Sequence, residues 1–302
     1  MKMIAVVGPT ACGKTARGVD LARALGGEIV SADSRQVYTG MDVGTGKDLA
    51  DYGTDVPYHL IDVAPAGYKY NLYEYLRDAR AAIADIEARH RLPIIVGGSG
   101  LYVESLLKGI VMPEVPEDKA LRMSLAGKSL TELTEILAGM KRLHNNTDVD
   151  TAQRAIRAIE IETYYQAHPE ESEAAHTPKP LDATIIGVEI DRDNRRAAIS
   201  RRLRRRFEQE NMLDEVQALL RSGIAADDLI YYGLEYKYLT LHLTGQIDRR
   251  QMEQELETAI HQFAKRQMTW FRGMERRGFN IHWLPYDMPR AEFVETVKDL
   301  AS

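Results

Sequence analysis

The chain has 302 residues with a formal net charge of −6, and 44% of its residues are hydrophobic and 28% charged. This composition is typical of folded globular proteins and excludes disordered, collagen-like and disulfide-stapled classes. The single cysteine, Cys12, can form no internal disulfide, and no Cys/His cluster predicts structural zinc. No apolar run approaches the ~20 residues that span a bilayer. We therefore expect a monomeric, cytoplasmic protein that makes no membrane contact.

Short runs rich in Val and Ile alternate with helical stretches along the N-terminal third of the chain. This alternation is typical of βαβ units and a parallel sheet. The predicted strands cover residues 3–7, 28–32, 58–63 and 92–96. The predicted helices cover residues 14–25, 72–89 and 101–108.

Pro113 and Pro116 mark a change from this alternation to helices alone. Helices are predicted at 130–140 and 151–166, followed by a polar, Pro-containing loop over 168–182. We interpret residues 113–182 as a helical insertion lobe. The remaining residues, 1–112 and 183–302, then form one α/β core.

The second part of this core is predicted to begin with a strand at 183–190. A long helix follows, on which Ile199, Leu203 and Phe207 recur at four-residue spacing and should face the core. Another helix at 249–274 precedes a strand at 280–284. Its expected buried side is marked by Leu256, Ile260, Phe263 and Phe271. Trp270 and Phe271 are expected to belong to the core rather than to a base-stacking surface.

One segment, GPTACGKT, fits the phosphate-loop pattern GxxxxGK[ST] and lies between a predicted strand and a predicted helix, as that motif requires. The residues expected to bind phosphate are Gly8, Pro9, Thr10, Ala11, Cys12, Gly13, Lys14 and Thr15. Lys14 would neutralise phosphate charge and the Thr15 hydroxyl would reach Mg²⁺. Cys12 is interpreted as a small residue of the loop rather than a nucleophile. The expected fold class is thus α/β, a P-loop NTPase-like parallel sheet core with a helical insertion domain.

Asp33 is the only acid near this loop at the end of a predicted strand, where α/β proteins bind ligands. It could hold Mg²⁺ through water, accept a proton from a nucleophile, or cap the following turn. Its neighbours Ser34, Arg35 and Gln36 suit recognition of a nucleobase or phosphate. No predicted strand ends in a Walker-B acid, which argues against an ordinary nucleotide hydrolase.

Two basic segments contrast with the acidic total charge. Eight arginines lie between residues 192 and 206 against a single acid, Asp193. A second basic group near the C-terminus comprises Lys265, Arg266, Arg272, Arg276 and Arg277. Like charges at i,i+4 destabilise an isolated helix, so this crowding favours an anionic partner such as RNA.

With these motifs in place, the sequence closely resembles the tRNA dimethylallyltransferase family, also called tRNA isopentenyltransferases. The matching stretches are residues 8–15, 31–38, 40–45, 59–62, 92–102, 154–160, 264–272 and 282–283. They occur in order over nearly the whole chain, whereas a generic P-loop kinase would share only the first of them.

The resemblance implies transfer of a dimethylallyl group from dimethylallyl diphosphate to N6 of an adenosine next to the tRNA anticodon, at position 37, with release of pyrophosphate. Asp33 matches the family's catalytic aspartate, which orients the amine and takes its proton. Thr10 and Arg206 match residues that act on leaving-group charge. The cofactor implied is Mg²⁺.

The resemblance also implies residues that contact tRNA. Asp33, Ser34, Arg35, Gln36 and Ser99 match positions around the target adenine, which must leave its stack to react. Gln153, Arg154 and Arg157 match a tRNA-contacting helix, and Lys265 and Arg266 are added from the second basic group. Two simpler interpretations stay open: Arg154 and Arg157 could lie on a solvated helix face, and Ser99 could be a helix N-cap.

The chain departs from the family pattern at Gly46-Lys47-Asp48, at Ile260-His261 and over residues 233–237. These departures concern the tRNA contacts rather than the diphosphate site. Three other functions remain as alternatives. A small-molecule kinase or NTPase would use the same loop, a prenyltransferase of free adenine nucleotides would not need Arg154 or Arg157, and a non-enzymatic RNA-binding module would not need Asp33 or Lys14.

Overall fold

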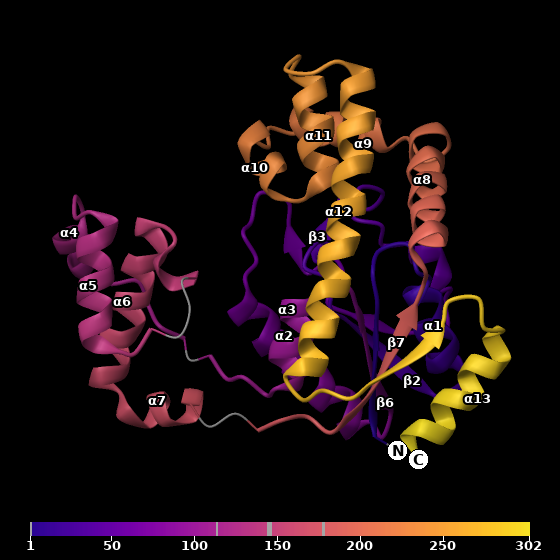
Figure 1. Ribbon diagram of the computed structural model, residues 1–302, viewed down its shortest axis with the longest axis horizontal. Helices are drawn as coiled ribbons and strands as arrows, with labels where there is room; N and C mark the ends of the chain where they lie inside the picture. Colours follow the sequence, from indigo (N-terminus) through magenta and orange to yellow (C-terminus); the bar gives the residue numbers. More distant parts are fainter. Residues whose placement is uncertain (1, 113, 144–146, 177–178) are drawn as a thin grey trace. The chain divides into compact units, whose positions relative to one another are not determined.

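A computed structural model describes residues 2–112, 114–143, 147–176 and 179–302 (Figure 1). The chain divides into two units. Unit 1 comprises residues 1–108 and 181–302, and unit 2 comprises residues 109–180. The chain therefore leaves the first unit once and returns to it.

Unit 1 is built on a six-stranded sheet whose strand order is β4-β2-β6-β1-β7-β8. Every neighbouring pair in it is parallel. The strands are β1 (Met3–Val7), β2 (Gly27–Ser31), β4 (Tyr58–His59), β6 (Leu92–Gly97), β7 (Ala183–Glu189) and β8 (Ile281–Pro285). The central strand β1 is buried along its whole length, as its continuous apolar sequence requires. The predicted parallel α/β core is confirmed.

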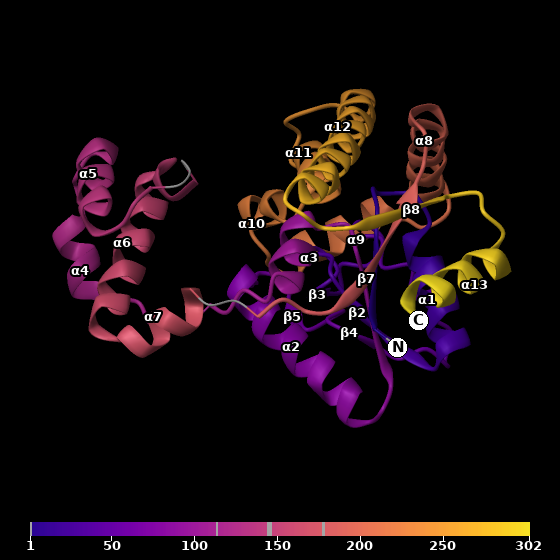
Figure 2. The ribbon, with the colours of Figure 1, turned by 60° about the horizontal axis from the view of Figure 1, so that its bottom comes forward.

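Helices pack on both faces of this sheet. On one face, alternate side chains such as Ile4, Val6 and Ile94 form a core with α1 (Lys14–Leu25) and α13 (Arg290–Ala301), which lie side by side (Figure 2). The helices α2 (Leu72–Ala88) and α3 (Gly100–Leu107) also contact β6 and are joined by the stacked rings of Tyr75 and Tyr102. The carboxyl ends of β1, β2 and β6 are thereby held at one edge of the sheet.

One predicted strand is largely wrong. Only Tyr58–His59 of the expected segment 58–63 pairs in the main sheet. Leu60 and Asp62 have positive φ values of 64° and 58°, and a strand cannot continue through that backbone conformation. The chain instead forms a small second sheet, in which β3 (Tyr38–Thr39) pairs with β5 (Ala64–Pro65), and a short 3₁₀ helix at Leu49–Asp51 lies between these two strands in the sequence.

A group of helices follows β7 in unit 1. They are α8 (Arg192–Glu208), α9 (Met212–Arg221), α10 (Ala226–Tyr231), α11 (Leu234–Leu243) and α12 (Arg249–Arg276). The prediction that Ile199 and Leu203 are buried is confirmed, and Phe207 is half-buried. Phe263 was expected to be buried on α12, but it is 38% exposed. No helix in the described part of the chain is long and apolar enough to cross a membrane.

Unit 2 is helical, with α4 (Lys119–Leu125), α5 (Leu130–Met140), a 3₁₀ turn at Thr147–Val149, α6 (Ala152–Ala167) and α7 (Pro169–His176). Leu133, Leu137 and Ile159 lie at the centre of its core. The predicted loop over 168–182 is wrong for residues 169–176, because Pro169 is tolerated in the first turn of a helix. Residues 177–178 of that loop lie outside the described residues. The short helix α4 was not predicted.

Candidate active site

The phosphate loop connects β1 to α1 and leaves the first turn of α1 open to a ligand. Gly13, at the N-cap of α1, has φ 82°, a conformation that glycine adopts readily. Within the described structure no side chain caps this helix, so the first backbone N–H groups and the positive end of the helix dipole remain available for an anion. Cys12 is buried, and burial raises the pKa of its thiol, which disfavours a nucleophilic thiolate.

A pocket of about 580 Å³ in unit 1 opens beside this loop. Predicted site residues that line it are Thr10, Lys14, Thr15, Asp33, Ser34, Arg35, Gln36, Ser99, Arg206 and Arg266. Residues that directly follow β2 and β6 thus meet residues of α8 and α12 at the carboxyl edge of the sheet, where α/β folds bind their ligands.

Asp33 follows β2 and faces this pocket. Its Oδ1 accepts a hydrogen bond from the backbone N–H of Arg35 at 3.0 Å, which is the turn-capping role that the sequence left open. Its second oxygen, Oδ2, has no hydrogen-bond partner among the described residues. The same carboxylate can therefore hold the turn with one oxygen and meet a ligand with the other.

The polar residues around Asp33 are joined to one another inside the protein. The Ser99 hydroxyl accepts from the Ser34 backbone N–H at 2.9 Å and donates to Ser34 Oγ at 3.1 Å. Ser99 occupies the N-cap position of α3, but its side chain bonds Ser34 instead of the helix. Gln36 accepts from Ser31 Oγ at 3.1 Å and donates to the Gly46 carbonyl at 3.0 Å, so its amide is engaged at both ends.

Arg206 is a buried cation without sufficient partners. Its side chain is only 5% exposed, and its Nε and Nη2 atoms have no hydrogen-bond partner in the described part of the chain. Burial and the neighbouring Arg202 lower its pKa to about 10, which still leaves it positively charged at neutral pH. Glu235 Oε1 lies 3.6 Å from Arg206 Nη1. Because unpaired buried charges are costly, this arrangement favours an anionic ligand in the pocket.

Gln267 is a site residue whose role the sequence interpretation missed. It is buried on α12, where its Oε1 accepts from the Thr10 backbone N–H at 2.8 Å and its Nε2 donates to the Gly98 carbonyl at 2.9 Å. The side chain thus links the phosphate loop to the end of β6. An uncharged polar residue among the buried apolar positions of α12 was the available signal.

Other predicted residues lie outside the pocket. Gln153, Arg154 and Arg157 are on α6 in unit 2, where Arg154 pairs with Asp150 and Arg157 with Glu160. Lys265 is exposed on α12 and does not line the pocket. Phe271 is fully buried as expected, whereas Trp270 is 39% exposed and lines the pocket, so the core interpretation is wrong for Trp270.

The phosphate loop at the sheet edge and the buried Arg206 guanidinium, which line one pocket, define the class of P-loop-like α/β proteins with an anion-binding site. Comparison with known proteins agrees. The family model for isopentenyl transferase matches residues 1–53, and that for IPP transferase matches residues 36–274. The chain belongs to the tRNA dimethylallyltransferase family, and it is a prenyltransferase.

The full-length relatives include tRNA dimethylallyltransferase 1 of Porphyromonas gingivalis, which is 60% identical over 301 residues, 99% of this chain and 98% of that protein. A tRNA dimethylallyltransferase 2 of Bacteroides fragilis is 57% identical over 299 residues, 98% of this chain and 96% of that protein. These relatives confirm the family that the motifs indicated.

Solved structures give the same result. The tRNA isopentenylpyrophosphate transferase of Bacillus halodurans superposes with a TM-score of 0.72 at 30% identity, over 99% of this chain and 96% of that one. A eukaryotic dimethylallyltransferase acting on tRNA has a TM-score of 0.81 at 20% identity, over 99% of this chain and 78% of that one, and this likeness bears on the fold alone.

Proposed function

We propose that this enzyme transfers a dimethylallyl group from dimethylallyl diphosphate to N6 of adenosine 37, next to the tRNA anticodon, and releases pyrophosphate. The observation that carries the proposal is the buried, incompletely paired Arg206 guanidinium, which faces the same pocket as the phosphate loop and Asp33. The names of the relatives support tRNA as the acceptor and dimethylallyl as the transferred group. We also expect it to act as a monomer, since residues of a single chain line the pocket, and we expect it to be cytoplasmic.

The diphosphate would lie on the phosphate loop. In this arrangement the backbone N–H groups of residues 11–15, the Lys14 ammonium and the Arg206 guanidinium meet the phosphate oxygens. Charge accumulates on the bridging oxygen as the allylic C–O bond breaks, and these cations stabilise it together with Thr10. Gln267 would support this step indirectly, because it holds the Thr10 backbone.

Asp33 would act on the adenine. The exocyclic amine is a weak nucleophile, so a carboxylate that orients it and accepts its proton would assist N–C bond formation. The oxygen of Asp33 that is not engaged with Arg35 is available for this proton. The reaction balances: the C–O bond breaks, the N6–C bond forms, the proton passes to Asp33, and pyrophosphate leaves.

The tRNA contacts would come from three groups of residues. Ser34, Arg35, Gln36 and Ser99 lie near Asp33 and would surround the extruded base, with Gln36 acting through the turn that its amide braces. Arg266 at the pocket and the exposed Lys265 would meet the backbone phosphates. Gln153, Arg154 and Arg157 of unit 2 would supply further contacts to the RNA.

Mg²⁺ would be bound together with the diphosphate rather than before it. Among the described residues no group of three or more His, Cys, Asp and Glu side chains could hold a metal. Thr15 and Asp33 nevertheless line the same pocket, and Mg²⁺ commonly uses few protein oxygens, substrate phosphates and water. The donors present fit such a site, in which the ion would neutralise phosphate charge and Thr15 would ligate it.

The test is mass spectrometry of nucleosides from unmodified tRNA incubated with the protein, Mg²⁺ and dimethylallyl diphosphate, with free AMP in parallel. We expect one dimethylallyl group on a tRNA adenosine and none on AMP. Modification of AMP alone would instead identify an enzyme of free nucleotides. ATP hydrolysis without any prenyl transfer would return the protein to the kinase and NTPase class.

A further inference from the structure

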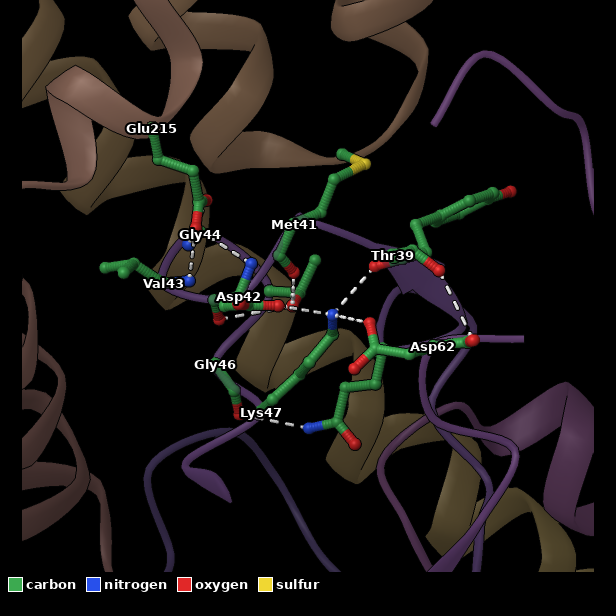
Figure 3. A network of polar contacts seen from close by, with 12 residues as sticks. Thr39, Met41, Asp42, Val43, Gly44, Gly46, Lys47, Asp62 and Glu215 are labelled. Carbon is green, nitrogen blue, oxygen red and sulfur yellow. Dashed lines mark hydrogen bonds and ion pairs between the residues drawn. The ribbon is translucent and has the colours of Figure 1, made fainter. Parts of the chain in front are cut away.

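One wall of the pocket is the loop at residues 41–48, named here the Gly46 loop (Figure 3). Its residues Gly44, Thr45, Gly46 and Asp48 line the pocket. The loop has no strand or α-helix of its own over these residues, so contacts with other parts of the chain must fix its position. Figure 3 shows two such contacts, one made by Glu215 and one made by Lys47.

The first contact is the Glu215 carboxylate from α9. Its Oε2 accepts hydrogen bonds from the backbone N–H groups of Asp42 and Val43, both at 2.8 Å. Its Oε1 accepts from the Gly44 N–H at 3.0 Å and from the Tyr236 hydroxyl at 2.5 Å. Three consecutive N–H groups that converge on one carboxylate form an anion-binding nest, here filled by a side chain of the protein itself.

The second contact is made by Lys47 of the loop itself, whose side chain is 1% exposed and reaches Tyr38 and Asp62 outside the loop. Its ammonium group donates to the Tyr38 carbonyl at 2.7 Å and forms ion pairs with Asp42 and with Asp62. Two carboxylates therefore compensate one buried cation, and the bond to the Tyr38 carbonyl ties the loop to β3 of the small sheet. Both ends of the Gly46 loop are thus fastened.

Between these contacts, Gly46 lies against the buried Arg206 and the half-buried Arg202. Its carbonyl accepts from Gln36 Nε2 at 3.0 Å and from Arg202 Nη2 at 3.3 Å. A Cβ atom on Gly46 would lie 1.9 Å from Arg202 Nη2 and 2.0 Å from Arg206 Nη2. The guanidinium groups therefore rest directly on this backbone, and a shift of the loop would displace them.

We propose that Glu215 is a positioning residue for the diphosphate site. By holding three N–H groups of the Gly46 loop, it fixes the backbone against which Arg202 and Arg206 are placed. The inference rests on the proposed function, because it takes the ligand of these arginines to be a diphosphate. Glu215 itself does not line the pocket and would act only through the loop.

The variant Glu215→Gln tests this role, since the amide keeps the size of the side chain but replaces one acceptor oxygen by a donor. We expect titration calorimetry with inorganic pyrophosphate and with dimethylallyl diphosphate to show affinities about tenfold weaker than those of the wild type. The KM for dimethylallyl diphosphate should rise more than the KM for tRNA. The milder Tyr236→Phe, which removes one of the four donors to Glu215, should weaken binding by about twofold to threefold.

The matched control is Asp214→Asn, which removes the same charge from the neighbouring, exposed position of α9. It should leave both affinities unchanged. Wild-type affinities in folded Glu215→Gln, with or without a lower melting temperature, would overturn the inference and leave a purely structural role. Failure of the wild type to bind either ligand would instead contradict the proposed function. If Glu215→Gln does not fold, wild-type affinity in Tyr236→Phe is the result that overturns the inference.

Discussion

At the scale of single residues, the site contains positively charged side chains whose hydrogen bonds are incomplete in the free protein. Arg206 is held in a buried position with two unpartnered nitrogen atoms, and Arg202 Nε is also unpartnered among the described residues. Such groups cost folding free energy unless a ligand completes their hydrogen bonds. A trade of stability for ligand binding is common at functional sites.

This trade predicts opposite effects of Arg206→Gln on activity and stability. We expect kcat/KM for dimethylallyl diphosphate to fall by about 100-fold, because a charged donor to the leaving group is lost. The melting temperature of the free protein should stay the same or rise. Steady-state kinetics and thermal melts measure the two effects. Arg204→Gln, an exposed change of the same charge on α8, serves as the control and should alter neither.

Asp33→Asn separates the turn-capping role of this residue from its chemical role. The asparagine oxygen can still accept from the Arg35 N–H, so the turn should persist, but the amide cannot take the proton of the adenine amine. We expect transfer to fall by about 100-fold or more, with the affinity for pyrophosphate changed less than about twofold. A rate of transfer equal to that of the wild type in single-turnover assays would refute the assignment of Asp33 as the base.

At the scale of elements, the helices α12 and α6 have different roles: α12 carries pocket residues, and α6 carries the buried carboxylate of unit 2. The long helix α12 brings Ile260, Arg266 and Gln267 to the pocket on one face, and Gln267 ties the phosphate loop to β6. The helix α6 instead organises unit 2 around the buried Glu160. That carboxylate accepts from the Asp118 N–H at 2.6 Å and from Arg122 Nε and Nη2, both at 2.9 Å, and it pairs with Arg157.

Arg154 and Arg157 of α6 should therefore respond differently to substitution. Arg157→Ala removes a partner of a buried carboxylate and a donor to the Val115 carbonyl, so it should destabilise unit 2 by about 1–3 kcal/mol in urea denaturation. Arg154→Ala removes only an exposed pair with Asp150 and should cost less than about 1 kcal/mol.

If Arg154 contacts tRNA phosphates, Arg154→Ala should also reduce the slope of log affinity against log salt by about 1. Filter binding at several salt concentrations measures this slope. An unchanged slope would assign Arg154 to a solvated helix face. Arg157→Ala is less informative in this assay, because its structural effect accompanies any loss of RNA contact.

At the scale of the whole molecule, buried carboxylates held by arginines occur in both units. In unit 1, hydrogen bonds from Arg89 lower the pKa of Glu28 to about 2, against the effect of burial. In unit 2, burial would raise the pKa of Glu160, but Arg122, Arg157 and the Asp118 N–H hold it at about 2. Both groups are thus more easily ionised in the folded chain than in the unfolded chain.

This difference predicts acid sensitivity in a defined range. Each carboxylate stabilises its unit above its ordinary pKa of about 4.3, and the contribution is lost as the pH falls from there toward about 2. Glu28→Gln should lower the stability of unit 1 at neutral pH and flatten its dependence on pH, and Glu160→Gln should do the same for unit 2. Urea denaturation between pH 7 and pH 2 tests this; a wild-type pH dependence in either variant would contradict it.

The sequence alone determined the features that depend on local order. Strand β1, the phosphate loop and α1 were predicted correctly, because an apolar run, a glycine-rich turn and an amphipathic helix are adjacent in the chain. The family followed from motifs in sequence order. Asp33 was identified because parallel strands bring their carboxyl ends to one edge, a rule that needs no coordinates.

Only the tertiary structure decided which side chains have partners. Gln267 lies 257 residues from Thr10, and Glu215 lies 171 residues from Gly44, so no local pattern could pair them. The strand predicted over 58–63 failed for the same reason: positive φ angles at Leu60 and Asp62 redirect the chain into the small sheet that Lys47 braces. Burial and hydrogen bonding depend on contacts between distant segments, whereas motifs and periodicity report only on neighbours.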